Sequence, residues 1–323
     1  MHARLLHNAI AGATVVGLFD VSVESAEALA AELDVAVFDS AVKACACEAD
    51  AVVICTPTPT HLAMIELAAA AGKAIFCEKP LSLDYSDFVA AIEIVSSAGV
   101  PFHIGFNRRF DPSHMRVRNA VVGGELGDLR QVHIVSRDPA PPPIDYITRS
   151  GGLFADMTIH DFDMALYITN SAITSVIATA AVMVDPAIAE AGDSDTASLL
   201  LTHKNGVVTT IQNCRQSAYG YDQRVEAFGS LGSAASENHQ VDSAMLHTAA
   251  GSQRSGLKTF FVERYEESYA RQWNQFIAAL NGGVDDAAQL VDGEVGKASL
   301  LISLAAAQSV KEKRSVAISE VAT

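Results

Sequence analysis

The chain has 323 residues, of which 50% are hydrophobic and 19% are charged, so it holds enough apolar material for two domains with sizeable cores. Its formal net charge of −16 argues against nucleic acid and anionic membranes as partners, because both would repel it. Its apolar runs are too short to span a bilayer and it has no signal peptide, which predicts a cytoplasmic protein.

Apolar runs alternate with helical patterns along the first hundred residues. Strands are expected at 15–19, 51–55, 74–77 and 102–105, and helices at 4–10, 24–33, 62–71 and 84–98. Strands that are apolar on both faces and separated by helices are typical of a parallel sheet covered on both sides. This pattern predicts a nucleotide-binding type of domain over residues 1–106.

The pattern changes after residue 106. Strands are expected at 131–136, 175–183, 197–203, 207–213 and 224–228, and helices at 154–168, 263–280 and 292–309. Consecutive strands without intervening helices favour an open, largely antiparallel sheet. Residues 107–323 are therefore expected to form a second, α+β domain. Within it, Pro139–Pro143 is either a surface connector or a wall of the active site.

Five cysteines, at Cys45, Cys47, Cys55, Cys77 and Cys214, lack the spacing of a disulfide framework or a zinc site. We therefore expect five reduced thiols and no bound metal.

Asp20 follows an apolar strand and precedes a helix. A carboxylate at this place can accept hydrogen bonds from the ribose hydroxyls of NAD and would repel the extra phosphate of NADP, although an aspartate there is also a common helix cap. The Thr56–His61 loop stands at the carboxyl end of the next long strand, where ligands bind in open parallel sheets.

Lys79 lies at the end of a further strand, between Glu78 and Pro80. Its ammonium group could orient a hydroxyl substrate and stabilise the alkoxide that forms as the proton leaves. The alternative is an ordinary solvated lysine. Pro80 could carry a cis bond, which the sequence does not decide.

Asp156 and His160 are four residues apart on an expected helix and would therefore share one face. A neutral imidazole can take the proton of a hydroxyl while the carboxylate binds a second hydroxyl. Asp163 is available as a supporting partner, and the glycines at 151 and 152 would let a ligand approach closely. The alternative is a histidine that is only hydrogen-bonded in the core.

Five segments together resemble the Gfo/Idh/MocA oxidoreductase family over nearly the whole chain. They are CTPTPTHLAMIELAAAAGKAIFCEKPLSLD, GFNRRFDPSH, SRDPAPPPIDYITRSGGLFADMTIHDFDMA, YGYDQRVEAFGS and FFVERYEESYARQW. The CEKP element is typical of the whole family. GFNRRFDP, SRDPAPPP and DMTIHDFD are more specific, and they are similar to its inositol dehydrogenase branch.

The resemblance implies an N-terminal Rossmann-type, doubly wound parallel sheet that binds NAD, and a C-terminal α+β domain that binds substrate and builds a homotetramer. It implies NAD-dependent oxidation of a ring hydroxyl of myo-inositol, or of a close stereoisomer, to the keto-inositol. Two alternatives stay open. One is a dehydrogenase of another cyclitol or a pyranose, and the other is a cofactor-deficient, non-catalytic polyol-binding relative.

The resemblance also implies roles for individual residues. It places the catalytic group on Lys79, Asp156 and His160, with His160 as the general base. It places the cofactor contacts on Asp20, Thr56, Pro57, His61, Glu78 and Lys79, and the polyol contacts on Arg108, Tyr219 and Tyr221.

The sequence departs from the family at its start. Family members open with a strand and a G-x-G-x-x-G turn, neither of which precedes the first expected helix here. That turn supplies backbone N–H groups to the cofactor's pyrophosphate, and the strand is central in the sheet. We therefore expect weak NAD binding and a marginally stable first domain.

Overall fold

The computed structural model describes residues 1–283 and 291–321 and divides the chain into two compact units. Unit 1 comprises Met1–Asn107 with Glu267–Lys297, and unit 2 comprises Arg108–Glu266 with Ala298–Thr323. The division after Asn107 lies one residue beyond the predicted domain boundary after residue 106. The predicted division differs in that it gave residues 267–297 to the second domain.

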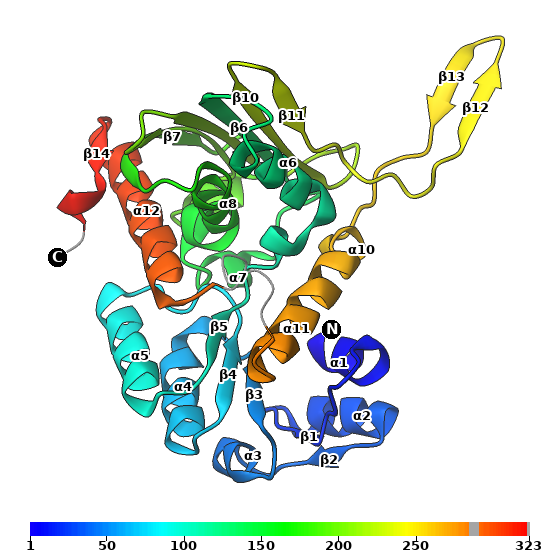
Figure 1. The fold of residues 1–323 in the computed structure, drawn as a ribbon, viewed down its shortest axis with the longest axis vertical. Coiled ribbons are helices and arrows are strands. Elements are labelled where there is room, and N and C mark those ends of the chain that lie inside the picture. The colour runs from blue at the N-terminus through cyan, green and yellow to red at the C-terminus, as the bar shows by residue number, and fades with distance from the viewer. Residues whose placement is uncertain (284–290, 322–323) are drawn as a thin grey trace. The chain divides into compact units, whose positions relative to one another are not determined.

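Unit 1 contains alternating strands and helices, most of which the sequence predicts (Figure 1). Its strands are β1 (Gly17–Leu18), β2 (Ala36–Val37), β3 (Ala51–Ile54), β4 (Ala74–Cys77) and β5 (Phe102–Ile104), and all their pairings are parallel. The helices between and before them are α1 (His2–Ala9), α2 (Val23–Leu33), α3 (Ala41–Ala46), α4 (His61–Ala70) and α5 (Tyr85–Ala98). The expectation of a doubly wound, Rossmann-like unit is confirmed.

The five parallel strands fall into two sheets. β1 pairs with β2, and β3, β4 and β5 form the other sheet, so β1 and β3 are both edge strands in the part of the chain that the structure describes. Every residue of β4 is buried, whereas three of the four residues of β3 and both residues of β1 are only half-buried. The apolar sequence of β3 is therefore less covered than a central strand would be.

An aromatic cluster explains why α11 (Glu266–Leu280) belongs mainly to unit 1. The rings of Trp273 on α11 and Phe76 on β4 have centroids 4.2 Å apart, and Phe276 packs edge-on against Phe76 at 6.0 Å. His2 of α1 joins the cluster and accepts a hydrogen bond from the indole N–H of Trp273 at 3.0 Å. These contacts join residues that are far apart in the sequence, so strand and helix patterns alone could not predict them.

Unit 2 is built on a mixed sheet of seven strands in the order β11-β10-β6-β9-β8-β7-β14. The β6–β9 pairing is parallel and the other neighbours are antiparallel, as expected for a largely antiparallel sheet. The strands are β6 (Leu129–Arg137), β7 (Ile173–Ala181), β8 (Thr196–His203), β9 (Val208–Cys214), β10 (Asp222–Gly229), β11 (Ser233–Ala235) and β14 (Val316–Ala317).

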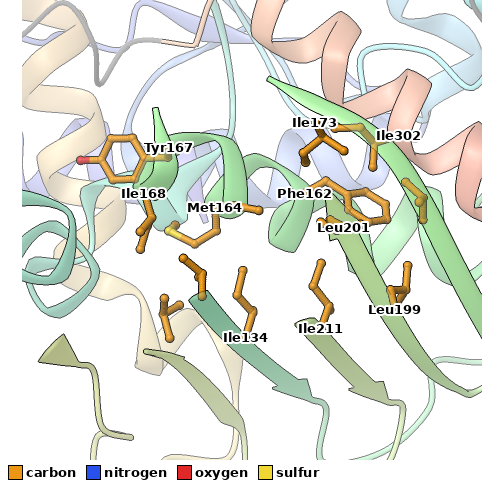
Figure 2. Packing of buried hydrophobic residues seen from close by; sticks show 14 of the residues in the cluster. Ile134, Phe162, Met164, Tyr167, Ile168, Ile173, Leu199, Leu201, Ile211 and Ile302 are labelled. Atoms are coloured by element: carbon orange, nitrogen blue, oxygen red, sulfur yellow. The ribbon is translucent and has the colours of Figure 1, made fainter. Parts of the chain in front are cut away.

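Side chains alternate between buried and exposed along these strands, so one face of the sheet is covered and the other is open. The covered face packs against α8 (Ile159–Thr169), α6 (Pro112–Val122) and the second part of α12 (Gly293–Glu312). Figure 2 shows Phe162 and Met164 of α8 facing strand residues such as Ile134 and Ile211. The alternation that predicted the strands thus places their apolar residues in the core.

The remaining elements are short. They are α7 (Ile144–Ile147), α9 (Pro186–Glu190), α10 (Phe261–Arg264), a hairpin of β12 (Met245–Thr248) and β13 (Gly251–Arg254), and the turns η1 (Thr58–Thr60), η2 (Asn107–Phe110), η3 (Phe154–Thr158) and η5 (Ile318–Glu320). No helix within residues 1–283 and 291–321 is both long and apolar enough to cross a bilayer.

Candidate active site

Asp20 stands two residues after the end of β1, exposed in the loop to α2. Its Oδ1 accepts the backbone N–H of Ser22 at 2.8 Å. The N-cap of α2 is Ser22, whose hydroxyl accepts the N–H of Ser25, so Asp20 is not the helix cap. A carboxylate has lone pairs for further donors, so Asp20 can accept hydrogen bonds beyond the one from Ser22.

The loop after β3 is fixed by its own hydrogen bonds. Thr60 donates its hydroxyl to Thr56 Oγ1 and to the carbonyl of Pro57, both at 2.7 Å. His61 is only 1% exposed, and its Nε2 lies 2.8 Å from the Thr56 carbonyl while its Nδ1 lies 3.1 Å from that of Pro80. Burial lowers the pKa of His61. His61 therefore joins the loops after β3 and β4, and Thr56 and Pro57 form the surface of the first.

Glu78 is held by three features of unit 1. Its Oε1 lies 2.8 Å from His2 Nε2, and its Oε2 accepts the backbone N–H of Lys79 at 3.0 Å. A Cβ atom on Gly105 would come within 2.9 Å of the Glu78 carboxylate, so only glycine leaves room for this side chain. The Lys79–Pro80 peptide is cis, which the sequence left open. The half-buried Lys79 thus extends from a well-supported loop at the end of β4.

These residues of unit 1 fit NAD in part. The acid after β1 and the loops after β3 and β4 stand at the carboxyl ends of parallel strands, where a dinucleotide binds. The described part of helix α1 has no side-chain hydrogen bond at its N-terminus.

Asp156 and His160 lie in unit 2 on one helical segment, but the segment is not a regular α-helix throughout. Residues Phe154–Thr158 form a π-helical turn, η3, and α8 begins only at Ile159. The predicted helix over 154–168 is therefore present, and its first five residues are π-helical. A π turn is wider than an α turn and is frequent at functional sites, so it changes the direction of Asp156 relative to His160.

The Asp156 carboxylate is bound on both oxygens. Tyr146 donates its hydroxyl to Oδ1 at 2.8 Å, and Arg215 donates from Nη1 to Oδ2 at 3.1 Å. Arg215 is 1% exposed and Asp156 is mostly buried, so this ion pair is screened little by water. Burial, aided by the Asp156 charge, raises the pKa of Tyr146 and keeps the phenol a donor.

Asp193 holds the backbone in place just before the π turn η3. Its Oδ1 accepts the backbone N–H of Leu153 at 2.9 Å, and a Cβ atom on Gly152 would come within 2.9 Å of the same oxygen. Gly152 also has φ +81°, which favours glycine. The expected close approach to Gly152 is therefore made by the carboxylate of Asp193. Asp193 lies 3.7 Å from Arg215 Nη2, so one arginine pairs with both acids.

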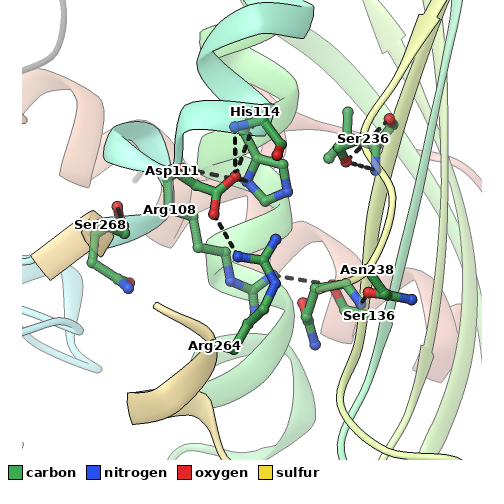
Figure 3. Close-up of polar contacts among 12 residues, drawn as sticks. Arg108, Asp111, His114, Ser136, Ser236, Asn238, Arg264 and Ser268 are labelled. Atoms are coloured by element: carbon green, nitrogen blue, oxygen red, sulfur yellow. Dashed lines mark hydrogen bonds and ion pairs between the residues drawn. The ribbon is translucent and has the colours of Figure 1, made fainter. Parts of the chain in front are cut away.

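Arg108 is buried in a polar network (Figure 3). It donates from Nη1 to Asp161 Oδ1 at 2.7 Å and to the hydroxyl of Ser136 at 3.0 Å. The other Asp161 oxygen accepts from Asn213 Nδ2 at 2.7 Å, and Asn213 Oδ1 accepts the hydroxyl of Thr158 at 2.7 Å. This network connects Arg108 to both ends of the π-to-α junction that carries the predicted catalytic residues.

Asp163 is paired with an arginine. Both of its oxygens accept from Arg109 Nε, at 3.0 and 2.9 Å, and both side chains are buried. The pair therefore fixes η2 to α8 inside unit 2.

Asp138 is a partly buried carboxyl near the same charges. Burial raises its pKa to about 6, against the attraction of Arg108 and Arg215 and with the repulsion of Asp156. It lies directly before the proline run of residues 139–143. A carboxyl that titrates near neutral pH in such surroundings is a candidate site residue.

The two tyrosines predicted to contact a polyol lie in different surroundings. Tyr219 is 54% exposed and donates its hydroxyl to Asp222 Oδ2 at 2.6 Å. Tyr221 is 8% exposed and packs edge-on against Tyr265 at 6.1 Å.

The supporting residues Tyr146, Asp193, Asn213 and Arg215 were missed by sequence reasoning. They come from segments up to 59 residues from Asp156, and the 3.6-residue or two-residue periods of the chain carry no signal for such pairings.

Comparisons with known proteins place the sequence among oxidoreductases. Residues 1–106 match a family described as "Oxidoreductase family, NAD-binding Rossmann fold", and residues 114–235 match the "GFO/IDH/MocA C-terminal domain". An inositol 2-dehydrogenase of Rhizobium meliloti is 45% identical over 98% of this chain and 95% of its own.

Two solved structures are similar over nearly their whole length. A myo-inositol dehydrogenase of Corynebacterium glutamicum is 35% identical with a TM-score of 0.91, covering 98% of this chain and 94% of that one. A scyllo-inositol dehydrogenase of Lactobacillus casei, solved with bound NAD(H) and scyllo-inositol, is 26% identical with a TM-score of 0.90, covering 98% and 95%.

Proposed function

Because the chain belongs to the Gfo/Idh/MocA family of NAD-binding oxidoreductases, we propose that it oxidises a ring hydroxyl of myo-inositol, or of a close stereoisomer, to the ketone. The single observation that carries the proposal is the Asp156–His160 segment, with a carboxylate fixed on both oxygens one helical turn before an imidazole. The inositol dehydrogenases that match along almost the entire chain support the choice of substrate.

In the proposed reaction His160 accepts the proton of the reacting hydroxyl. NAD, when bound, supplies the acceptor for the hydride that leaves the same carbon. Loss of this proton and this hydride turns the secondary alcohol into a ketone, so atoms and electrons balance. The Lys79 ammonium stabilises negative charge on the oxygen as the proton leaves, and Asp156 accepts a hydrogen bond from a ring hydroxyl.

The supporting contacts fit these roles. Tyr146 and Arg215 fix the Asp156 carboxylate, and a fixed acceptor selects the orientation of a polyol ring. Asp20 binds the ribose of NAD, and the loops with Thr56, Pro57, His61 and Glu78 face the cofactor. Arg108, Tyr219 and Tyr221 contribute to the polyol side of the site. The Nη1 atom of Arg108 donates to Asp161 and Ser136, which fixes the position of the guanidinium group.

The proposal includes a homo-oligomer, as a tetramer, and a cytoplasmic location. The location is supported by the five cysteines, all of which are unpaired thiols.

A polyol panel tests the substrate. We expect NAD-dependent turnover with the highest kcat/KM for myo-inositol or scyllo-inositol, and lower values for pyranoses such as glucose. A pyranose preferred over every inositol by tenfold or more would refute the cyclitol assignment while leaving the dehydrogenase assignment intact.

A further inference from the structure

Tyr146 lies on α7, the four-residue helix that follows the proline run (Figure 1). The backbone N–H groups of Tyr146 and Ile147 both donate to the Pro143 carbonyl, at 3.0 and 3.1 Å. Ile147 is 3% exposed and anchors the helix in unit 2, whereas Tyr146 is 42% exposed. The phenol is therefore mounted on a rigid proline segment and is still open to a ligand.

The phenol and the Asp156 carboxylate form a pair of hydrogen-bond acceptors. Tyr146 donates its only hydroxyl proton to Asp156 Oδ1 at 2.8 Å, so the phenol oxygen can only accept further hydrogen bonds. Burial and the Asp156 charge raise the pKa of Tyr146, which keeps that proton on the phenol. A carboxylate has about four lone-pair sites, and the Asp156 side chain is 12% exposed. Two acceptor oxygens thus lie 2.8 Å apart, and both side chains are at least partly exposed.

A ring polyol supplies the matching donors. Each of its hydroxyls carries one O–H group, and hydroxyls on bonded ring carbons lie about as far apart as these two acceptors unless both are axial. Two axial neighbours point in opposite directions and cannot reach both acceptors. The pair of acceptors is therefore sensitive to the configuration of two neighbouring ring carbons.

We infer that Tyr146 binds a ring hydroxyl directly, beside the hydroxyl that Asp156 binds, and that it helps to determine which stereoisomer fits. The inference rests on the proposed function, because it names a further substrate contact of the same site. It gives Tyr146 a role beyond that of holding Asp156 in place.

The variant Tyr146→Phe tests the contact, since it removes the phenol oxygen and keeps the ring. The matched control is Tyr85→Phe, which removes a half-buried phenol from α5 in unit 1. We would measure kcat/KM with NAD for myo-inositol and for each of its monodeoxy analogues. Calorimetry gives the binding constants of the same ligands without the need for turnover, and melting temperatures check that each variant is folded.

We expect Tyr146→Phe to lower kcat/KM for myo-inositol by about tenfold or more, because two hydrogen bonds are lost. The loss should be about 2- to 12-fold smaller for the analogue without the hydroxyl that Tyr146 binds, since one neutral hydrogen bond contributes about that much. It should also be smaller for the analogue without the neighbouring hydroxyl, which Asp156 binds. Tyr85→Phe should match the wild-type chain with every ligand.

A tyrosine that only holds Asp156 would shrink the loss for one analogue alone, and that result would overturn the inference. A Tyr146→Phe variant with wild-type constants for every ligand would overturn it as well. If the wild-type chain binds inositols without oxidising them, the proposed function fails, and the same comparison of binding constants still decides whether Tyr146 makes the contact.

Discussion

At the scale of single residues, the account depends on the side chains that move or hold a proton. Replacing His160 by Ala should lower turnover by about 10²- to 10⁴-fold, because a general base contributes that much to proton transfer. Lys79→Ala should have an effect of similar size, because the developing alkoxide loses its cation. Steady-state kinetics measure both.

The matched controls are His7→Ala and Lys204→Ala, which replace exposed residues in α1 and in the β8–β9 turn. Both should retain wild-type turnover. Full activity in either Lys79→Ala or His160→Ala would refute the catalytic assignment.

Arg215 tests whether the Asp156 carboxylate must be fixed. Losing a charged hydrogen bond costs about 1.5–3 kcal/mol, so Arg215→Ala should lower kcat/KM by about 10- to 150-fold, with Arg215→Lys in between. The loss should be larger than that of Arg149→Ala, which removes an exposed ion pair with Asp145. Equal melting temperatures with a reduced kcat/KM would separate a positioning role from general destabilisation, and an unchanged kcat/KM in Arg215→Ala would contradict the positioning role.

The low pKa of Asp222 predicts how the stability of the fold depends on pH. Burial alone would raise its pKa, but hydrogen bonds from Arg224, Tyr219 and Asn238 outweigh burial and lower the pKa to about 2. The folded state therefore binds this proton less readily than the unfolded state, whose aspartates titrate near 3.9. Stability from Asp222 is present above about pH 4 and is lost as the pH falls toward 2.

The free energy of unfolding between pH 2 and 5 checks this expectation. Asp222→Asn should be less stable than wild type at pH 5, and the difference should shrink toward pH 2. A difference that stays constant over this range would show that Asp222 does not titrate with folding.

At the scale of elements, the π turn is the feature on which the site geometry depends. Deleting Ala155 should convert Phe154–Thr158 into an α turn and rotate Asp156 away from its two donors. We expect turnover to fall by at least tenfold while the far-ultraviolet circular dichroism stays close to that of wild type.

The matched control is Ala155→Gly, which keeps the chain length and hence the π turn. It should retain most of the activity. A deletion variant as active as this control would show that the turn type does not matter to the site.

The elements also show what the sequence could predict. Long periodic patterns gave β6, β8 and α5 to within two residues, because their apolar residues repeat at the strand or helix period over many positions. β2 has two residues and α3 has six, which is too short for a period to be recognised. The π turn was also missed, since its sequence reads as an ordinary helix start.

At the scale of the whole molecule, the motifs predicted the family, and the order of strands and helices predicted both types of sheet. The contacts between distant segments of the chain were not predicted. The return of α11 to unit 1 depends on Trp273 meeting Phe76 and His2, and the fixing of Asp156 depends on Arg215. The strand and helix periods of the sequence give no sign of either contact. Weak NAD binding and marginal stability of the first unit remain predictions.

Hydride transfer from myo-inositol tests the central claim most directly. Purified protein is supplied with NAD and with myo-inositol deuterated at its ring carbons, and the reduced cofactor and the ring product are analysed by mass spectrometry. The account predicts one deuterium in each NADH formed, one keto-inositol per NADH, and neither product with His160→Ala. Inositol that binds without forming deuterated NADH, at saturating NAD, would contradict the account and favour a polyol-binding protein without catalysis.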